Sequence, residues 1–318
     1  MKRLHGGAKD PSLLDFSANV NFLGPPDGVR ALLAGAADHV DRYPSADAAP
    51  LREALARHHG IPADCILAGN GASDLIYLVA ALHRGRRGRV VTPAFTEYED
   101  ACDAYGIALG ATAPELTFVG NPGSPDGRLH PKMEILALPG IRIVDEAFID
   151  FAGGRESLID AATADPGLIV LRSLTKFYAL PGLRIGFLVA VPETLRALKL
   201  LQPPWSVNQL AQLAGIAAIQ DAAYAERTLR ELPPAREELR SGLSRLGLDP
   251  SPSETNYVLC RVRDAAALGT SLLARGIVVR NCDSFTGLEP NRFVRIAVRA
   301  PAENRRLLAA LGELRGCP

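Results

Sequence analysis

Short apolar runs alternate with helical patterns through the first two thirds of the chain. Runs rich in valine, isoleucine and leucine predict strands, and a segment between two of them, Asp74–His83, has the spacing of a helix. This alternation is typical of an α/β fold with a mainly parallel sheet flanked by helices. The predicted strands are Cys65–Ala68, Arg89–Thr92, Leu116–Val119, Ile141–Val144, Leu168–Leu171 and Ile185–Ala190.

The pattern changes after residue 205. Two long helical stretches, Asn208–Leu232 and Pro234–Leu246, precede three strand-like runs, Tyr257–Val262, Ile277–Arg280 and Phe293–Val298. This order predicts a smaller C-terminal α/β domain. We therefore divide the chain into an N-terminal arm (1–40) that packs with the small domain, a large domain (41–205) and a small domain (206–318).

Composition narrows the class of protein. Basic and acidic residues balance at 35 each, so no overall field favours nucleic acid or an anionic membrane. No apolar run is long enough to cross a bilayer, and the first residues lack the apolar core of a signal peptide. The five cysteines are odd in number, dispersed and without a CxxC pair, which favours reduced thiols in a cytoplasmic protein.

Lys176 is the candidate for covalent chemistry. It is one of only five lysines, it follows the apolar run Leu168–Leu171, and hydroxyl residues flank it. A lysine amine can form a Schiff base with an aldehyde. Asp145 follows another apolar run and could keep a pyridine nitrogen protonated, while Arg184 could bind a phosphate. Together these residues predict a pyridoxal phosphate (PLP) site; the alternative for Lys176 is a surface lysine on a loop.

Other segments could complete such a site. In Gly69–Asp74, small residues open a helix whose N-terminal N–H groups could bind phosphate, although an ordinary turn with Ser73 as N-cap has the same pattern. Phe95 could stack on a flat ring or belong to the core. Ser173 and Thr175 could cap a strand end, but beside Arg184 we favour phosphate contacts.

Two arginines lie inside apolar strands of the predicted small domain. Arg280 ends one run and Arg295 interrupts another. A buried charge is costly unless it is paired. The pair therefore indicates sites for substrate anions, or, as the alternative, internal ion pairs with aspartate or glutamate.

These motifs resemble those of the fold-type I PLP enzymes, in the histidinol-phosphate aminotransferase-like group, and most of all those of the threonine-phosphate decarboxylases of cobalamin biosynthesis. The resemblance runs from His5 to about Leu307. The segments that carry it are His5-Gly6-Gly7, Asp15–Asn21, Arg42-Tyr43-Pro44, Gly69-Asn70-Gly71, Asp145–Phe148, Leu171–Arg184 and Pro204–Asn208.

The resemblance implies a large PLP-binding domain, a homodimer with shared active sites and a role for each matched residue. Lys176 and Asp145 are the catalytic residues, with Asp145 at the ring nitrogen. The cofactor contacts are Gly71, Ala72, Ser73, Phe95, Ser124, Asp145, Ser173, Thr175, Lys176, Arg184 and, from the other subunit, Tyr43. Arg295 would hold the substrate carboxylate, His5, Gly6, Asn19 and Arg280 would surround the substrate phosphate, and Ser124 would contact the ring oxygen or the carboxylate.

Two departures from the family pattern stand out. Ser124 takes the place of an asparagine beside the ring, and its side chain is shorter. The stretch between Gly106 and Asp145 is also short, which suggests a trimmed helix or strand in the large domain.

Three functions are open on this basis. The first is PLP-dependent decarboxylation of L-threonine O-3-phosphate to (R)-1-amino-2-propanol O-2-phosphate in cobalamin biosynthesis. The second is transamination of histidinol phosphate or a related amino acid, since one cofactor frame serves both reactions. The third is a non-catalytic binding module with the same fold. The His5-Gly6-Gly7 arm favours the decarboxylase.

Overall fold

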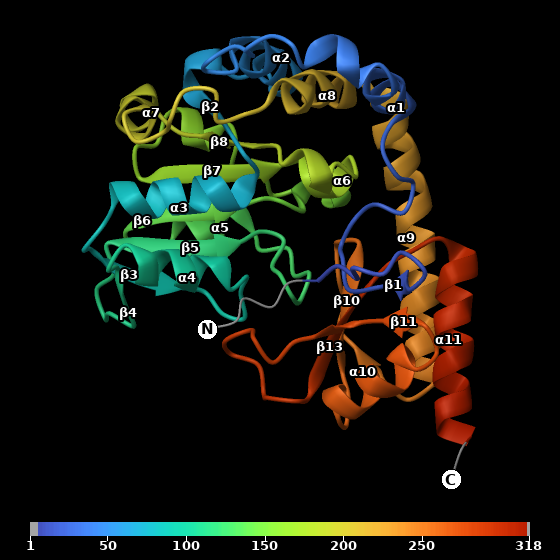
Figure 1. Ribbon diagram of the computed structural model, residues 1–318. Coiled ribbons are helices and arrows are strands. Elements are labelled where there is room, and N and C mark those ends of the chain that lie inside the picture. The colour runs from blue at the N-terminus through green and yellow to red at the C-terminus, as the bar shows by residue number, and fades with distance from the viewer. Residues whose placement is uncertain (1–5, 317–318) are drawn as a thin grey trace.

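The computed structural model describes residues 6–316 and contains a seven-stranded sheet at its centre (Figure 1). The strand order is β2-β8-β7-β6-β5-β3-β4. β8 runs antiparallel to both of its neighbours, and the other pairs are parallel, so the predicted mainly parallel sheet is confirmed. The strands are β2 (Ile66–Gly69), β3 (Arg87–Val90), β4 (Ala108–Leu109), β5 (Leu116–Gly120), β6 (Ile141–Asp145), β7 (Leu168–Ser173) and β8 (Gly186–Val189).

Helices cover both faces of this sheet, so its strands carry continuous apolar runs. In β7, Ile169 and Leu171 join one apolar cluster, whereas Leu168 and Val170 join the cluster on the opposite face. The first cluster includes α3 (Ala72–Leu82), α4 (Glu97–Ala104) and α7 (Pro192–Lys199). The second includes α1 (Asp27–Ala34), α2 (Ala49–His59), α5 (Lys132–Leu136) and α8 (Gln209–Gln220).

A second sheet has the order β12-β13-β10-β9 and is antiparallel. Its strands are β9 (Asp249–Pro250), β10 (Tyr257–Arg261), β12 (Arg280–Asn281) and β13 (Phe293–Ala297). Beside it, β1 (Leu14–Asp15) pairs in parallel with β11 (Ile277–Val278). The helices of this region are α9 (Ala222–Arg245), α10 (Ala265–Leu273) and α11 (Pro301–Gly316). Figure 1 shows the long helix α9 running from the region of α1 and α8 down to this sheet.

The predicted break between the two long helices is wrong. The sequence suggested a helix end at Pro233 and Pro234, but α9 continues through both prolines, and the break lies at Asp221. The Asp221 side chain accepts a hydrogen bond from Tyr224 N at 2.9 Å and so begins α9 as its N-cap. An internal proline costs a helix about 3 kcal/mol. Burial of an apolar stripe offsets that cost; its members are Leu232, Ala235, Leu239 and Leu243.

Strand bounds also shift. β3 begins two residues before the predicted run, and Ile277–Arg280 is divided into β11 and β12 because its two ends pair with different strands. The short segment from Gly106 to Asp145 still supplies three strands of the large sheet, β4, β5 and β6. However, β4 has only two residues and α5 only five. The remaining turns are the 3-10 helices η1 (Ala36–His39), η2 (Ala63–Cys65), η3 (Ile149–Ala152), η4 (Ala161–Thr163) and η5 (Pro181–Leu183).

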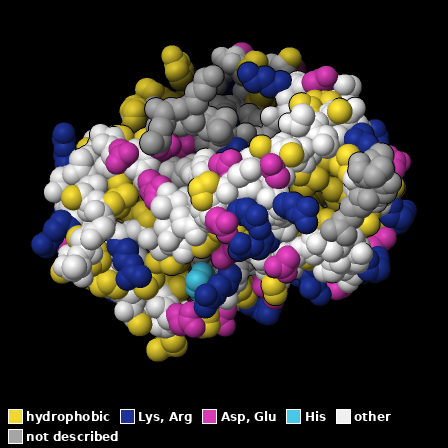
Figure 2. All heavy atoms as spheres, turned by 90° about the horizontal axis from the view of Figure 1, so that it is seen from below, with side chains coloured by type: hydrophobic (Ala, Val, Ile, Leu, Met, Phe, Trp, Pro, Cys, Tyr) yellow, Lys and Arg dark blue, Asp and Glu magenta, His cyan; other side chains and the backbone are white. Residues whose placement is uncertain are grey.

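The division into arm, large domain and small domain stays a prediction. β1, from the predicted arm, pairs with β11, whereas α8, from the predicted small domain, packs against α1 and α2. Within residues 6–316, no helix is both long and apolar enough to cross a membrane. Basic and acidic side chains are interspersed over the face shown in Figure 2, as the balanced composition implies.

Candidate active site

Lys176 lies where β7 gives way to the short helix α6 (Leu174–Phe177). Ser173 is the N-cap of this helix, its Oγ accepting from Thr175 N at 3.3 Å and lying 2.7 Å from Thr175 Oγ1. Burial, together with the charges of Arg295 and Arg184, lowers the pKa of the Lys176 amine to about 8, and Asp145 opposes this shift. A lysine with this pKa is partly neutral near physiological pH, as a nucleophilic amine must be.

Asp145 ends β6 and is buried. Its Oδ2 accepts from the Tyr98 hydroxyl at 2.7 Å, and its Oδ1 accepts from Ala147 N at 3.0 Å. Burial raises the pKa of Asp145, while the hydrogen bonds from Tyr98 and Ala147 and the charge of Lys176 lower it. Two hydrogen-bond donors therefore hold the Asp145 carboxylate, and it lies close enough to the Lys176 amine for the two charges to interact.

The first turn of α3 forms an anion-binding corner. Gly71 is the N-cap, with a φ of 88°, and no side chain caps the helix, so the alternative with Ser73 as N-cap fails. A β-carbon on Gly71 would lie 2.4 Å from Arg184 Nη2, so a larger residue would displace the guanidinium from this place. Uncapped N–H groups beside a guanidinium are the donors that a phosphate requires.

Arg295 reaches the same cavity from β13. Its Nη1 donates to Ser124 Oγ at 3.0 Å, and its Nη2 donates to the Ser17 carbonyl at 3.3 Å. Its guanidinium carbon lies 5.2 Å from the ring centre of Tyr257 and 5.7 Å from that of Phe285. Among residues 6–316, no carboxylate forms an ion pair with it, and its buried Nε has no hydrogen-bond partner. The internal-ion-pair alternative therefore fails for Arg295.

The N-terminal segment closes one side of the cavity. The Asp15 carboxylate accepts from Ala8 N at 2.9 Å and from Ser17 N at 2.7 Å, and Ser17 Oγ accepts from Gly7 N at 2.8 Å. These bonds hold the segment around Gly6 against residues 15–17. Arg280 donates to Ser284 Oγ at 2.9 Å on the β12 side.

These elements surround one cavity of about 370 Å³. Most residues predicted for the site line it: Gly6, Asn19, Ala72, Ser73, Phe95, Ser124, Asp145, Ser173, Thr175, Lys176, Arg184, Arg280 and Arg295. Three predicted residues are not among those that line it. Gly71 lies next to the Arg184 guanidinium, Tyr43 is 85% exposed, and His5 falls outside the described residues. Segments far apart in the chain thus converge on Lys176.

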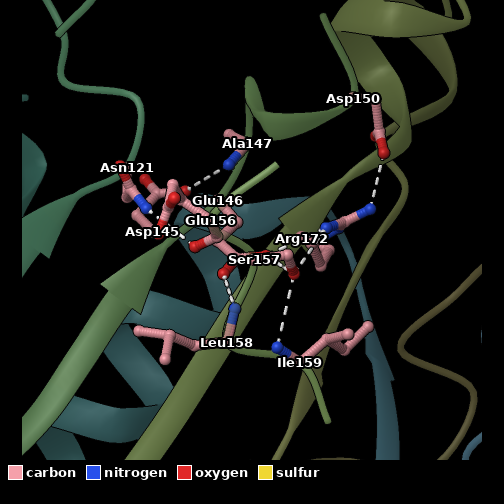
Figure 3. Close-up of polar contacts among 10 residues, drawn as sticks. All are labelled: Asn121, Asp145, Glu146, Ala147, Asp150, Glu156, Ser157, Leu158, Ile159 and Arg172. Atoms are coloured by element: carbon pink, nitrogen blue, oxygen red, sulfur yellow. Dashed lines mark hydrogen bonds and ion pairs between the residues drawn. The ribbon is translucent and has the colours of Figure 1, made fainter. Parts of the chain in front are cut away.

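A buried ionic cluster supports the turn after Asp145 (Figure 3). Arg172 donates to Glu146 Oε2 at 2.9 Å and to Asp150 Oδ1 at 2.5 Å. Glu146 also accepts from Ser157 Oγ and from Leu158 N, both at 2.6 Å. The cluster links the ends of β6 and β7, the two strands that carry Asp145 and the Lys176 turn. We expect it to fix their relative position.

The donor set fits PLP. A partly neutral amine, a buried carboxylate at the end of β6 and the corner at Gly71 and Arg184 meet in one cavity, and the absence of a β-carbon at Gly71 leaves room for Arg184. These are the three functions that the cofactor needs from its protein.

Comparisons with known proteins agree with this geometry. Residues 108–311 match the family model of aminotransferase class I and II. The threonine-phosphate decarboxylase of Salmonella typhimurium is 40% identical over 96% of this chain and 92% of its own length. The chain belongs to the aminotransferase class I and II family.

Two solved structures of this family show the same fold. The L-threonine-O-3-phosphate decarboxylase of Porphyromonas gingivalis has a TM-score of 0.89 at 28% identity, covering 96% of this chain and 100% of the other. The histidinol-phosphate aminotransferase of Sinorhizobium meliloti, solved with pyridoxal-5'-phosphate, has a TM-score of 0.86 at 25% identity, covering 95% and 90%. The predicted fold-type I class, and the resemblance itself, are confirmed.

Several residues that contact the site were not predicted from the sequence. Tyr98, Tyr257, Phe285 and Ser17 all contact predicted site residues. Tyr98 stands three residues after Phe95 at the start of α4, and Ser17 lies inside the Asp15–Asn21 motif. The sequence therefore contained a clue to both, because each lies in or close to a segment that was already predicted to belong to the site. Tyr257 and Phe285 carried none, because their place beside Arg295 depends on the pairing of β10, β12 and β13, strands far apart in the chain.

Proposed function

We propose that the chain is a PLP-dependent threonine-phosphate decarboxylase that converts L-threonine O-3-phosphate to (R)-1-amino-2-propanol O-2-phosphate in cobalamin biosynthesis. The observation that carries this proposal is the presence of two further arginines, Arg280 and Arg295, in the cavity that already holds Lys176 and Arg184. One arginine would serve the cofactor phosphate, and the other two line the same cavity, where a substrate with two anionic groups would meet them. Threonine phosphate has a carboxylate and a phosphate, and the decarboxylase relative supports this choice.

The cofactor would be held by residues already described. Lys176 supplies the amine for covalent attachment, Asp145 faces the ring nitrogen, and Arg184 with Ser73 and Ser173 binds the phosphate. Gly71, Ala72 and Thr175 complete the phosphate corner, and Phe95 covers the ring. When bound, PLP serves as an electron sink for a bond broken at the substrate Cα.

The remaining cavity residues orient the substrate. Arg295 binds the α-carboxylate, and its geometry determines how the carboxylate stands relative to the ring. Gly6, Asn19 and Arg280, with His5, surround the substrate phosphate. Lys176 lines the cavity, and its Nζ would return a proton to the substrate Cα after CO₂ has left.

The test is product identification. Purified protein with threonine phosphate and PLP should release CO₂ without any keto acid, and Lys176→Ala should lose both this activity and the yellow colour of lysine-bound cofactor. The matched control is Lys199→Ala, a substitution on the far helix α7. Turnover that depends on a keto acid and releases no CO₂ would reject decarboxylation and favour the histidinol-phosphate aminotransferase alternative.

We also propose that the protein is a homodimer with shared active sites. Tyr43 is 85% exposed, and its ring centre lies 5.2 Å from that of Trp205, which is 49% exposed. Leu200 and Val40 are exposed too. Exposed apolar side chains of this size support an interface, in which Tyr43 reaches the cofactor phosphate of the other subunit.

Subunit complementation tests this sharing. Tyr43→Ala and Lys176→Ala should each be weak or inactive alone. When co-expressed, they should regain activity at about a quarter of the sites, since half of the dimers are mixed and each mixed dimer has one intact site. Activity no greater than the mean of the two parents would contradict shared sites.

A cytoplasmic location is the last part of the proposal. The four cysteines among the described residues, Cys65, Cys102, Cys260 and Cys282, are free and buried, which suits a reducing compartment. Cell fractionation with an antibody against the protein is the direct check.

A further inference from the structure

Ser124 stands where three segments of the chain meet. Its Oγ accepts from Arg295 Nη1 at 3.0 Å, while Arg295 Nη2 donates to the Ser17 carbonyl at 3.3 Å. One guanidinium therefore joins strand β13, the turn after β5 and the segment that follows β1. All three partners line the cavity.

The turn that carries Ser124 is itself fixed. Tyr257 Oη donates to the Gly123 carbonyl at 2.5 Å, and Gly123 N donates to Arg128 O at 2.8 Å. Tyr257 also lies beneath the Arg295 guanidinium, at 5.2 Å. One aromatic side chain thus supports both the arginine and the turn that bonds it, so the position of the Ser124 hydroxyl is well defined.

These contacts hold Arg295 by neutral groups alone among residues 6–316. Its Nη1 and Nη2 are engaged by Ser124 and Ser17, its ring neighbours are Tyr257 and Phe285, and its buried Nε has no partner. A buried guanidinium held by neutral groups lacks a counter-charge, and a substrate carboxylate in the cavity that Arg295 lines would supply it.

We propose that Ser124 is a positioning residue that sets the orientation of Arg295, so that the guanidinium meets the substrate carboxylate. The inference rests on the proposed function, because it takes Arg295 as the carboxylate site. Ser124 acts through Arg295, with its hydroxyl engaged by the arginine rather than by the substrate. Loss of this hydroxyl therefore weakens recognition of the carboxylate and spares recognition of the phosphate.

Two ligands without an amine separate these effects. 3-Phosphonooxybutanoate has the carboxylate and the phosphate of the substrate, whereas isopropyl phosphate has only the phosphate. Their binding to the cofactor-loaded protein is measured by calorimetry. Ser124→Ala should weaken binding of 3-phosphonooxybutanoate about tenfold, the value of one hydrogen bond to a charged group, and change binding of isopropyl phosphate less than about twofold.

Ser253→Ala is the matched control. Its hydroxyl lies 2.9 Å from Thr255 Oγ1, beside Gly127 of the same turn, but it is not part of the cavity lining. This substitution should leave the binding of both ligands unchanged. An equal loss in Ser253→Ala would attribute the effect to the turn as a whole and overturn the specific role of Ser124.

A double-mutant cycle tests whether Ser124 acts through the arginine. In an Arg295→Ala background, Ser124→Ala should cause no further loss. An undiminished tenfold loss there would show direct contact with the ligand and overturn the inference alone, as would an unchanged affinity of Ser124→Ala for 3-phosphonooxybutanoate. If the unsubstituted protein binds both ligands equally, the carboxylate site and the proposed substrate fail together with the inference.

Discussion

Two buried arginines, one in each sheet, have opposite surroundings. Arg172 on β7 is 4% exposed and donates to the carboxylates of Glu146 and Asp150. Arg295 on β13 is 8% exposed and donates only to the Ser124 hydroxyl and a backbone carbonyl among residues 6–316. The sequence presents both in the same way, as a single charge within an apolar strand.

Their pKa values move in opposite directions. Burial by itself lowers the pKa of either guanidinium, but Asp150 and Glu146 raise that of Arg172 above its ordinary value. For Arg295, burial prevails over the opposing effects of Tyr257 and Cys282, and the pKa is lowered. A buried cation that the protein neutralises supports the fold, whereas one that it leaves without a counter-charge is suited to an anionic ligand.

The largest expected effect is on stability at Arg172. Arg172→Ala should lower the free energy of unfolding by about 3–5 kcal/mol, because Glu146 and Asp150 would remain buried without their cation. Urea denaturation followed by circular dichroism measures this. A loss below about 1 kcal/mol would mean that the cluster in Figure 3 is not the support described.

Arg295→Ala should show the reverse pattern. The free energy of unfolding should change by no more than about 1 kcal/mol, since no buried carboxylate is left behind. The value of kcat/KM for threonine phosphate should fall about 30- to 1,000-fold, corresponding to about 2–4 kcal/mol for a lost charged contact. Steady-state kinetics beside the same urea titration measure both. Strong destabilisation with intact kinetics would remove the distinction between the two arginines.

The smallest expected effect is a shift in pH dependence. The Lys176 amine must be neutral to react with the cofactor aldehyde, and its pKa is about 8, so the rate at which the apoprotein captures PLP should rise with pH through about 8. Because the Arg295 charge is one cause of the lowered pKa, Arg295→Ala should move the midpoint upward. Stopped-flow absorbance at a series of pH values gives the midpoint.

Arg172→Lys is the control for this shift. It keeps a cation in the cluster, and Arg172 is not among the groups that shift the Lys176 pKa. The midpoint should therefore stay in place. A downward shift in Arg295→Ala, or an equal shift in Arg172→Lys, would contradict the electrostatic account of the amine.

The parts of the molecule that could be predicted are those that local sequence determines. Apolar runs predicted the six main strands of the large sheet, and the chemistry of amine, carboxylate and guanidinium predicted Lys176, Asp145 and Arg184 as one group. These features depend on neighbouring residues in the chain. The prediction that the helix would end at Pro233 was local as well, and it was wrong because tertiary packing outweighs the proline.

Contacts across the two sheets could not be predicted. Tyr257 lies beside Arg295 because β10 and β13 pair in the second sheet. Its hydroxyl reaches the Gly123 carbonyl because this sheet meets the turn after β5, and no pattern within either segment encodes that meeting. The same holds for Ser124. Its sequence context marked it as a departure from the family, but its hydrogen bond to Arg295 depends on a residue 171 positions away.

Gly6 has almost no clearance from the backbone beside it. A β-carbon there would come within 2.1 Å of the Ser17 carbonyl oxygen, the same oxygen that accepts from Arg295 Nη2. An added methyl group at Gly6 would therefore displace either the N-terminal segment that contains Gly6 or the Ser17 peptide. The proposed carboxylate site at Arg295 is therefore sensitive to crowding at a position that carries no side chain.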